Sequence, residues 1–192
     1  MKNTFLYLLP LFFIIQSCTT KTGQETSIVY NENKSRVKIN FNNDWEFQKG
    51  EIDTTTLWEK VTVPHTWNNI DMQTQRNDFY AGMALYRKSY TPDTSLAGKR
   101  LFIRFEGVAS TAALYINDVF AGNHNGGYSA FAIEITDLLK YGEENRIIVK
   151  VDNTSRPDVV PINHRLFGVY GGIYRPVELI VTDKINITVT DY

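Results

Sequence analysis

Toward its C-terminal end the sequence gathers residue types that suit a binding surface for a polar ligand. Asn163, His164 and Arg165 precede the adjacent glycines Gly171 and Gly172, which stand between two tyrosines. Adjacent glycines permit positive φ angles or a close approach of the backbone. Amide, imidazole and guanidinium groups beside aromatic rings can hold a flat-faced polar ligand such as a sugar. We therefore expect ligand contact first from this group of three.

A second candidate cluster follows a predicted strand, in the segment Val63-Pro64-His65-Thr66-Trp67-Asn68. The rings of Trp67 and of the later Tyr80 can stack on a sugar or pack in a core or interface, and the residues alone leave both alternatives open. For His65 we favour a structural role over a place in a sugar pocket, because a Pro-His turn at a strand end is a common packing corner. A further glycine pair beside an aromatic, Gly126-Gly127-Tyr128, is interpreted as a tight structural loop.

Composition excludes some classes of partner. The chain has 192 residues, 20 basic and 21 acidic side chains and a net charge of −1. This near-neutral balance gives no reason to expect a nucleic-acid partner. Aromatic residues make up 13% of the chain, which favours a large core or a stacking surface. Nothing in the sequence indicates a cofactor or a metal site.

The N-terminus has the pattern of an export signal. Lys2 precedes an apolar run over residues 5–15, which is too short to span a bilayer as a stable helix and is interrupted by Pro10. Cys18, the one cysteine of the chain, follows directly and resembles the acylation site of a bacterial lipoprotein. We expect a signal peptide over 1–17, a lipid on Cys18 that anchors the chain to a membrane, at the periplasmic face or the cell surface, and a flexible tether over 18–34. Ordinary secretion with an incidental thiol is the alternative.

Short alternating segments fill the remainder of the chain. They predict an all-β antiparallel sandwich over 35–182. Asn117 and Asp118 predict a two-residue hairpin turn, because both tolerate positive φ, and residues 136–142 predict one helical turn. The expected strands are 36–41, 45–48, 58–63, 85–90, 99–106, 110–116, 119–122, 131–135, 145–152 and 173–181. A fresh alternation over 185–190 predicts one more strand, which we assign to a following domain.

Six motifs together resemble the N-terminal sugar-binding domain of family 2 glycoside hydrolases, the group of β-galactosidases, β-glucuronidases and β-mannosidases. Each motif is weak alone, but their joint order and spacing from about Val37 to Val181 are specific. The motifs are Phe41-Asn42-Asn43-Asp44-Trp45-Glu46-Phe47, Val63-Pro64-His65-Thr66-Trp67-Asn68, Tyr80-Ala81-Gly82, Leu114-Tyr115-Ile116-Asn117-Asp118, Gly126-Gly127-Tyr128-Ser129-Ala130-Phe131 and Gly171-Gly172-Ile173-Tyr174-Arg175.

The resemblance implies a jelly-roll sandwich of the galactose-binding-domain-like type. In the full enzymes it precedes an immunoglobulin-like domain, which residues 183–192 would begin, and a catalytic barrel. The family reaction is retaining hydrolysis of a β-glycoside by two glutamates about 5–5.5 Å apart. The resemblance places both in the barrel, so we assign no catalytic residue here and expect the chain alone to be inactive. The expected partners are a β-linked oligosaccharide or glycoside and the missing C-terminal domains.

The resemblance also bears on the first cluster. In relatives this loop reaches toward the active site and often carries an aspartate that contacts the sugar, where Leu166 stands here. His164 and Arg165 can substitute for that contact and suit a different or acidic substrate. The alternative is that Arg165 and Arg175 only pair with carboxylates of the next domain.

Three functions compete at this point. The favoured one is the N-terminal piece of an exported family 2 β-glycosidase. The second is a standalone carbohydrate-binding lipoprotein without catalysis. The third is a structural, lipid-tethered sandwich that docks a partner protein. Galactoside, glucuronide and mannoside enzymes share the six motifs, so the sugar stays open.

Overall fold

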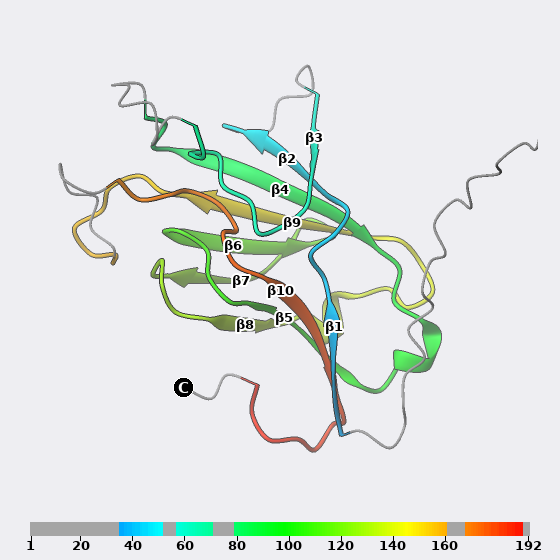
Figure 1. Cartoon of the computed structure of the whole chain (residues 1–192). Helices are drawn as coiled ribbons and strands as arrows, with labels where there is room; N and C mark the ends of the chain where they lie inside the picture. The colour runs from blue at the N-terminus through cyan, green and yellow to red at the C-terminus, as the bar shows by residue number, and fades with distance from the viewer. Residues whose placement is uncertain (1–34, 52–56, 71–78, 161–167, 190–192) are drawn as a thin grey trace, which may run out of the picture.

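In a computed structural model the chain forms two antiparallel β-sheets that pack face to face, as Figure 1 shows. The structure describes residues 35–51, 57–70, 79–160 and 168–189. The smaller sheet has the strand order β1 (Arg36–Asn40), β10 (Val177–Thr182), β5 (Arg100–Phe105) and β8 (Phe131–Glu134). The larger sheet has the order β3 (Glu59–Val61), β2 (Trp45–Lys49), β4 (Met83–Tyr90), β9 (Asn145–Asp152), β6 (Thr111–Ile116) and β7 (Val119–Asn125). The predicted all-β sandwich is confirmed.

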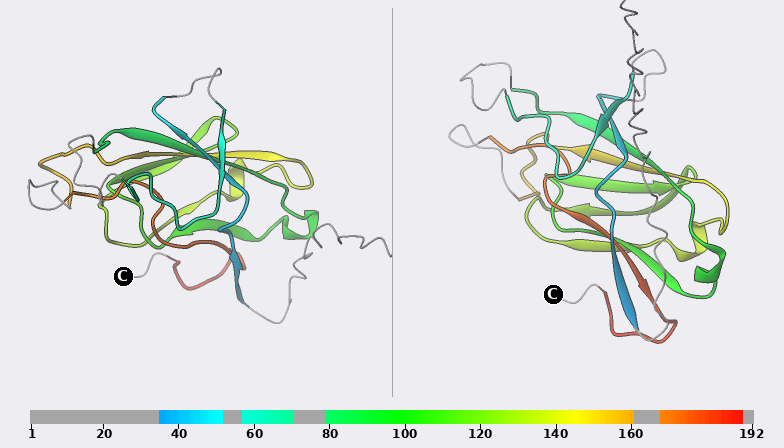
Figure 2. Two further views of the ribbon diagram at one scale, coloured as in Figure 1. Left: turned by 45° about the horizontal axis from the view of Figure 1, so that its top comes forward. Right: turned by 45° about the vertical axis from the view of Figure 1, so that its right-hand side comes forward.

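The core lies between the two sheets. The views in Figure 2 show from two further sides how the sheets face each other. Alternation along β5 places Leu101, Ile103 and Phe105 inside, all fully buried. The intervening Arg100 and Arg104 point outward and pair with carboxylates. The sequence pattern predicted this division, and the facing strands repeat it: Trp45, Tyr86, Leu114, Ile116, Ile147, Val149 and Leu179 also fill the core.

Three tight turns connect strands of the two sheets. Asn117 and Asp118 have φ angles of 50° and 68° and join β6 to β7, so the predicted hairpin is confirmed. The helical turn expected over 136–142 is a shorter 3₁₀ turn, η2 (Thr136–Leu138). A second 3₁₀ turn, η1 (Thr94–Leu96), was not predicted. It begins after Asp93, whose carboxylate accepts a hydrogen bond from the Ser95 backbone N–H.

The strand predicted over 173–181 begins four residues later, at Val177. Pro176 has no backbone N–H to give to a ladder. The backbone just before it is committed elsewhere, because the Ile173 carbonyl accepts from the His65 N–H at 2.8 Å and Gly172 bridges to Ala109. The Gly-Gly segment therefore bonds to loops at the end of the sandwich, and the ladder of β10 starts only beyond the proline.

The strand expected over 185–190 is also absent from residues 185–189, the part that the structure describes. Val189 instead packs on the outer face of the smaller sheet, against Phe102 and Ile180. The guanidinium of Arg36 donates to the carbonyl oxygens of Ile187 and Thr188, at 2.6 Å and 3.0 Å. The alternating pattern of the segment thus buries one apolar side chain against the sheet without adding a strand.

The expected signal peptide, Cys18 and the tether lie outside the described residues. Among the described residues, no helix is both long enough and apolar enough to cross a membrane.

Candidate functional site

Two motif segments of the sequence meet at one end of the sandwich, where β4 begins and β9 ends (Figure 1). Residues 63–68 and 168–173 run over this end and bond to one another through their backbones. The Trp67 N–H donates to the Gly171 carbonyl at 3.3 Å, and the Thr66 hydroxyl donates to the same oxygen at 2.8 Å. Two motifs that are about 100 residues apart in sequence therefore form one structural unit.

Two buried asparagines bind this unit together. The side-chain oxygen of Asn68 accepts from the Gly171 N–H at 2.8 Å, and its amide donates to the Tyr80 carbonyl at 3.0 Å. The amide of Asn153 donates to the Val169 carbonyl at 2.9 Å and to Asn68 Oδ1 at 3.2 Å. Both side chains are fully buried, so these bonds satisfy groups that water cannot reach. We call Asn68 and Asn153, with the backbone groups they bind, the asparagine bridge.

The Asn153 side chain also binds the segment that contains Tyr80, since its oxygen accepts from the Gly82 N–H at 2.9 Å. Sequence reasoning missed this residue. It stands in Asp152-Asn153-Thr154, directly after a strong strand, where an asparagine is typical of a turn. The one signal available was its position at the end of β9, and only the tertiary structure shows that its amide is buried.

Trp67 lies inside the fold. Its indole is 6% exposed, stacks on Phe47 with ring centroids 6.0 Å apart, and donates from Nε1 to the Tyr80 carbonyl at 3.3 Å. A Cβ atom at Gly171 would lie 1.9 Å from this ring, so only glycine fits there. Of the two alternatives that the sequence left open for Trp67, this packing favours the structural one.

Tyr80 is half-buried at the edge of the same cluster. Its hydroxyl donates to the Met83 carbonyl at 2.8 Å, and its ring meets Trp67 edge-on with centroids 6.2 Å apart. The ammonium of Lys49 lies 5.0 Å from the ring centroid. Burial raises the pKa of the Tyr80 hydroxyl, which stays a neutral donor. The ring is positioned by the protein and its role in substrate contact stays a prediction.

His65 has the structural surroundings that its sequence position favours. Its Nδ1 lies 2.8 Å from the Tyr86 hydroxyl and its ring packs on Phe47, with centroids 4.8 Å apart. Burial lowers the pKa of His65, so the neutral ring is favoured. Gly172, at φ 129°, comes so close to the His65 carbonyl that a Cβ atom would lie 2.4 Å from it.

The second glycine pair shapes a neighbouring loop. Gly126 has φ 136°, and its N–H donates to the Ser110 carbonyl at 2.9 Å. The Tyr174 hydroxyl donates to the Gly127 carbonyl, which joins this loop to the end of the Gly-Gly-Ile-Tyr-Arg motif. Tyr128 is exposed, and the guanidinium of Arg175 lies 5.5 Å from the centroid of the Tyr174 ring. Within the described ranges Arg175 makes no ion pair.

The asparagine bridge adjoins in sequence two ranges that the structure does not describe. Asn68 and Tyr80 lie on either side of residues 71–78, and Val169 follows residues 161–167. The three leading ligand candidates, Asn163, His164 and Arg165, belong to that second range and lie outside the described residues. What the bridge fixes is the backbone at Val169, just after this range.

Four carboxylates on or directly after the strands are partners of basic side chains. Each of the following ion pairs is at least partly open to solvent: Glu46 with Arg87, Glu106 with Arg104, Glu134 with Arg100 and Glu178 with Lys38. In the part of the chain that the structure describes, no three His, Cys, Asp or Glu side chains gather in a way that could hold a metal ion. This end of the molecule is therefore a network of buried hydrogen bonds that joins loop segments, with Asn68 and Asn153 at its centre.

The fold and this network define a β-sandwich binding domain that presents loops from one end. Comparison with known families makes the assignment specific: a family described as "Glycosyl hydrolases family 2, sugar binding domain" matches residues 25–183. The chain belongs to this family.

Relatives of known name are multidomain enzymes. A β-glucuronidase of Bacteroides fragilis is 42% identical over 82% of this chain and 22% of its own length. A β-galactosidase of Thermoanaerobacter pseudethanolicus is 35% identical over 78% of this chain and 21% of its own length. Among solved structures, a putative β-galactosidase from Bacteroides fragilis has a TM-score of 0.78 and 54% identity, over 82% of this chain and 25% of that one. The chain thus spans about a quarter or less of the length of these relatives.

Proposed function

We propose that this chain is the N-terminal sugar-binding domain of an exported β-glycosidase and helps to shape the substrate site of a catalytic domain supplied by the rest of that enzyme. The observation that supports this best is the asparagine bridge. It ties residues 66–68, 80–82, 153 and 169–172 into one buried network, and Asn163, His164 and Arg165 shortly precede the last of these segments in the sequence.

The physical role of the network is positioning. A side chain on a loop contacts a sugar productively only when the loop leaves the scaffold at a fixed place and angle. Buried amide hydrogen bonds specify such a place, because breaking one leaves a polar group without a partner. The proposed substrate is a β-linked glycoside, in line with the relatives named β-glucuronidase and β-galactosidase. The basic pair His164 and Arg165 favours an acidic sugar.

A domain exchange tests this proposal. The matching N-terminal part of the Bacteroides fragilis β-glucuronidase is replaced by residues 25–183 of this chain, and hydrolysis of nitrophenyl β-glucuronide is measured. We expect the hybrid enzyme to hydrolyse this substrate. An enzyme from which the N-terminal part is deleted should be inactive. Changing His164 and Arg165 to alanine should raise KM about tenfold or more, because the changes remove an imidazole and a guanidinium that can bond to the sugar. A second double variant, in which the exposed Lys140 and Arg146 are changed to alanine, is the control and should leave KM unchanged. An active deletion enzyme, or a KM unchanged by the double variant, would contradict the proposal.

We further propose export and acylation at Cys18, supported by the apolar run that precedes it in the sequence. Expression of the full chain in a bacterium with labelled palmitate should give a labelled protein in the membrane fraction. The Cys18→Ala variant should lose the label and leave the membrane fraction. Labelling and membrane retention of that variant would contradict lipid anchoring.

A further inference from the structure

A cleft of about 870 Å³ opens at the other end of β4, between the two sheets. Its volume is in the range of about 300–1,000 Å³ that is typical of ligand sites. The eight residues of β4 rise about 3.3 Å each, so its two ends are roughly 23 Å apart. The asparagine bridge lies at the beginning of β4 and the cleft at its end, beside η1. Among the strands that the structure describes, β1 is an edge strand of the smaller sheet with β10 as its neighbour, and the cleft lies beside this edge.

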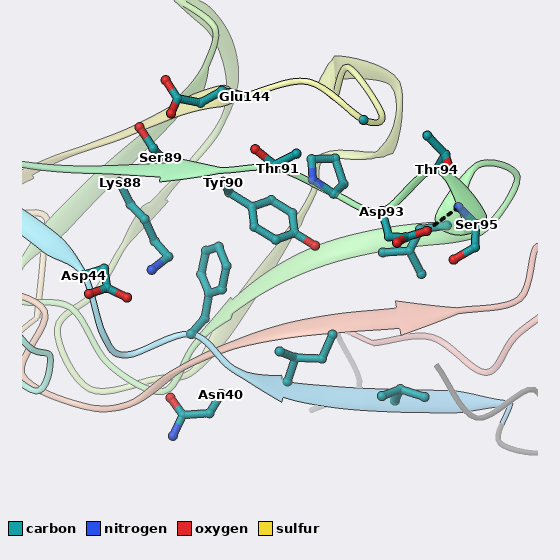
Figure 3. A pocket seen from close by; sticks show the side chains of 16 residues that line it. Asn40, Asp44, Lys88, Ser89, Tyr90, Thr91, Asp93, Thr94, Ser95 and Glu144 are labelled. Carbon is teal, nitrogen blue, oxygen red and sulfur yellow. Dashed lines mark hydrogen bonds between the residues drawn. The ribbon is translucent and has the colours of Figure 1, made fainter. Parts of the chain in front are cut away.

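Figure 3 shows how the side chains lie in this cleft. Lys88 and Asp44 are at one end, Tyr90 is in the middle, and Asp93 and Ser95 are at the other end. Tyr90 meets the buried ring of Phe41 edge-on, with centroids 5.2 Å apart. The aromatic pair provides an apolar wall, and polar groups stand on both sides of it.

Several of those polar groups are available to a ligand. Within the described residues, no hydrogen-bond partner is recorded for the hydroxyl of Tyr90 or for the carboxylates of Asp44 and Glu144. The carboxylate of Asp93 already accepts one hydrogen bond, from the Ser95 backbone N–H at the start of η1. At the base of the cleft Lys88 is 9% exposed and donates one bond, to the Asn43 carbonyl at 2.5 Å. An ammonium group has three donors.

A second hollow of about 400 Å³ shares the lining residues Asp44 and Ser89 with the first and is also lined by Glu46 and Lys60. We call the larger hollow the groove. Its volume is near the upper end of the range of ligand sites, which suits a few linked units better than a single small molecule.

The charge of the groove selects among such chains. The larger hollow is lined by three carboxylates, those of Asp44, Asp93 and Glu144, and by one ammonium, that of Lys88, so its net charge is negative. A uronic acid or sulfated sugar would meet carboxylates, whereas the hydroxyls of a neutral sugar can donate to them and accept from Lys88. An apolar ring wall with donors and acceptors beside it matches the two faces of a sugar ring.

We propose that this groove is a binding site for a neutral oligosaccharide chain, at the opposite end of β4 from the loops that the proposed function uses. It is a second contact point between this domain and a polymeric glycan. The proposal does not depend on the proposed function, since it would hold for a domain that takes no part in hydrolysis.

The test follows the backbone amide signals of the isotope-labelled full chain by NMR during titration with cellotetraose, a neutral tetrasaccharide, and with tetragalacturonate, an acidic one. We expect cellotetraose to shift the signals of Asp44 and of residues 89–96, and tetragalacturonate to bind these residues at least tenfold more weakly. Signals of residues 65–68 and 168–172 report separately on the other end, so failure at either site is seen independently.

Variants with matched controls give a second readout. Asp44→Asn combined with Glu144→Gln removes two carboxylate acceptors and should weaken cellotetraose binding about tenfold or more. The control combines Asp118→Asn with Glu143→Gln. Asp118 lies outside the groove and has a positive φ like that of Asp44, and Glu143 is the sequence neighbour of Glu144.

Three results would overturn the proposal. One is no shift in the groove with cellotetraose or with a galactotetraose titrated in the same way. Another is equal or tighter binding of tetragalacturonate. The third is a shift of the same groove signals by oligolysine and not by either neutral sugar, which would assign the groove to a basic peptide.

Discussion

The side-chain oxygen of Asn68 accepts a hydrogen bond of 2.8 Å from the backbone N–H of Gly171, across 103 residues of sequence. Both residues are buried. This bond joins the two most distinctive motifs of the chain at the end of the sandwich where β4 begins. The same asparagine oxygen also accepts from Asn153, so one atom fixes three segments.

Replacing Asn68 should therefore destabilise the whole domain. In Asn68→Ala the buried Gly171 N–H loses its partner inside the protein and the Tyr80 carbonyl loses one of its donors, and we expect a loss of about 2–4 kcal/mol in the free energy of unfolding. Urea denaturation followed by tryptophan fluorescence measures it. Asn69→Ala, at the exposed neighbouring residue, should change stability by less than about 0.5 kcal/mol. Equal effects of the two variants would show that the bridge contributes nothing.

The close approach at Gly172 can be separated from its backbone conformation. Gly172 and Gly98 both have positive φ, at 129° and 90°, but a Cβ would meet the His65 carbonyl at 2.4 Å in the first and nothing within 4 Å in the second. Gly98→Ala should cost about 1–2 kcal/mol from conformation alone. Gly172→Ala should cost at least about 2 kcal/mol more, because the backbone of residues 65 and 66 must shift. Thermal unfolding of both variants checks the difference, and similar melting temperatures would contradict it.

The buried, neutral His65 makes stability depend on pH. Burial lowers its pKa in the folded chain below the ordinary value of 6.5, so below pH 6.5 the unfolded chain binds more protons than the folded one. The contribution of His65 to stability is fully present above pH 6.5 and is lost as the pH falls through and below that value. His124, whose pKa burial also lowers, acts in the same direction.

Melting temperatures between pH 5 and pH 8 check this dependence. We expect the wild-type chain to lose stability on the acid side, and His65→Gln to lose less, because a glutamine can still bond to the Tyr86 hydroxyl but does not titrate. His124→Gln measures the second contribution. An identical pH profile for wild type and His65→Gln would rule out His65 as the source.

The contact between Arg36 and the segment 183–189 should protect that segment from proteolysis. Arg36 holds two carbonyl groups there, and Val189 covers Phe102. In Arg36→Gln we expect trypsin to cut after the exposed Lys184 several-fold faster. Global stability should change little, because the hydrogen bonds of Arg36 to the two carbonyl groups lie at the surface. Lys38→Gln, on the same strand, removes a tryptic site and a charge without touching the segment. Equal cleavage rates in the two variants would contradict the contact.

Much of the fold could be predicted from local pattern. Alternation along residues 99–106 identified both the inner face of β5 and its outer arginines, and Asn117-Asp118 identified a hairpin turn whose φ angles the structure confirms. These features depend on neighbours in sequence, and local stereochemistry determines them. The pattern failed at Ile173 and at Ile185, where alternating apolar residues occur without a ladder. A strand needs a partner with free hydrogen-bonding groups, and no local pattern reveals whether one is there.

The sequence by itself determined the class of the protein: an antiparallel sandwich carrying the ordered motifs of a family 2 sugar-binding domain. Only the tertiary structure decided the roles of individual residues. It turned Trp67 inward, gave Asn153 a buried place in the asparagine bridge and opened a groove lined by Asp44, Lys88 and Tyr90. The reason is physical: a motif records which side chains are present, whereas burial and hydrogen-bond partners arise when distant segments meet.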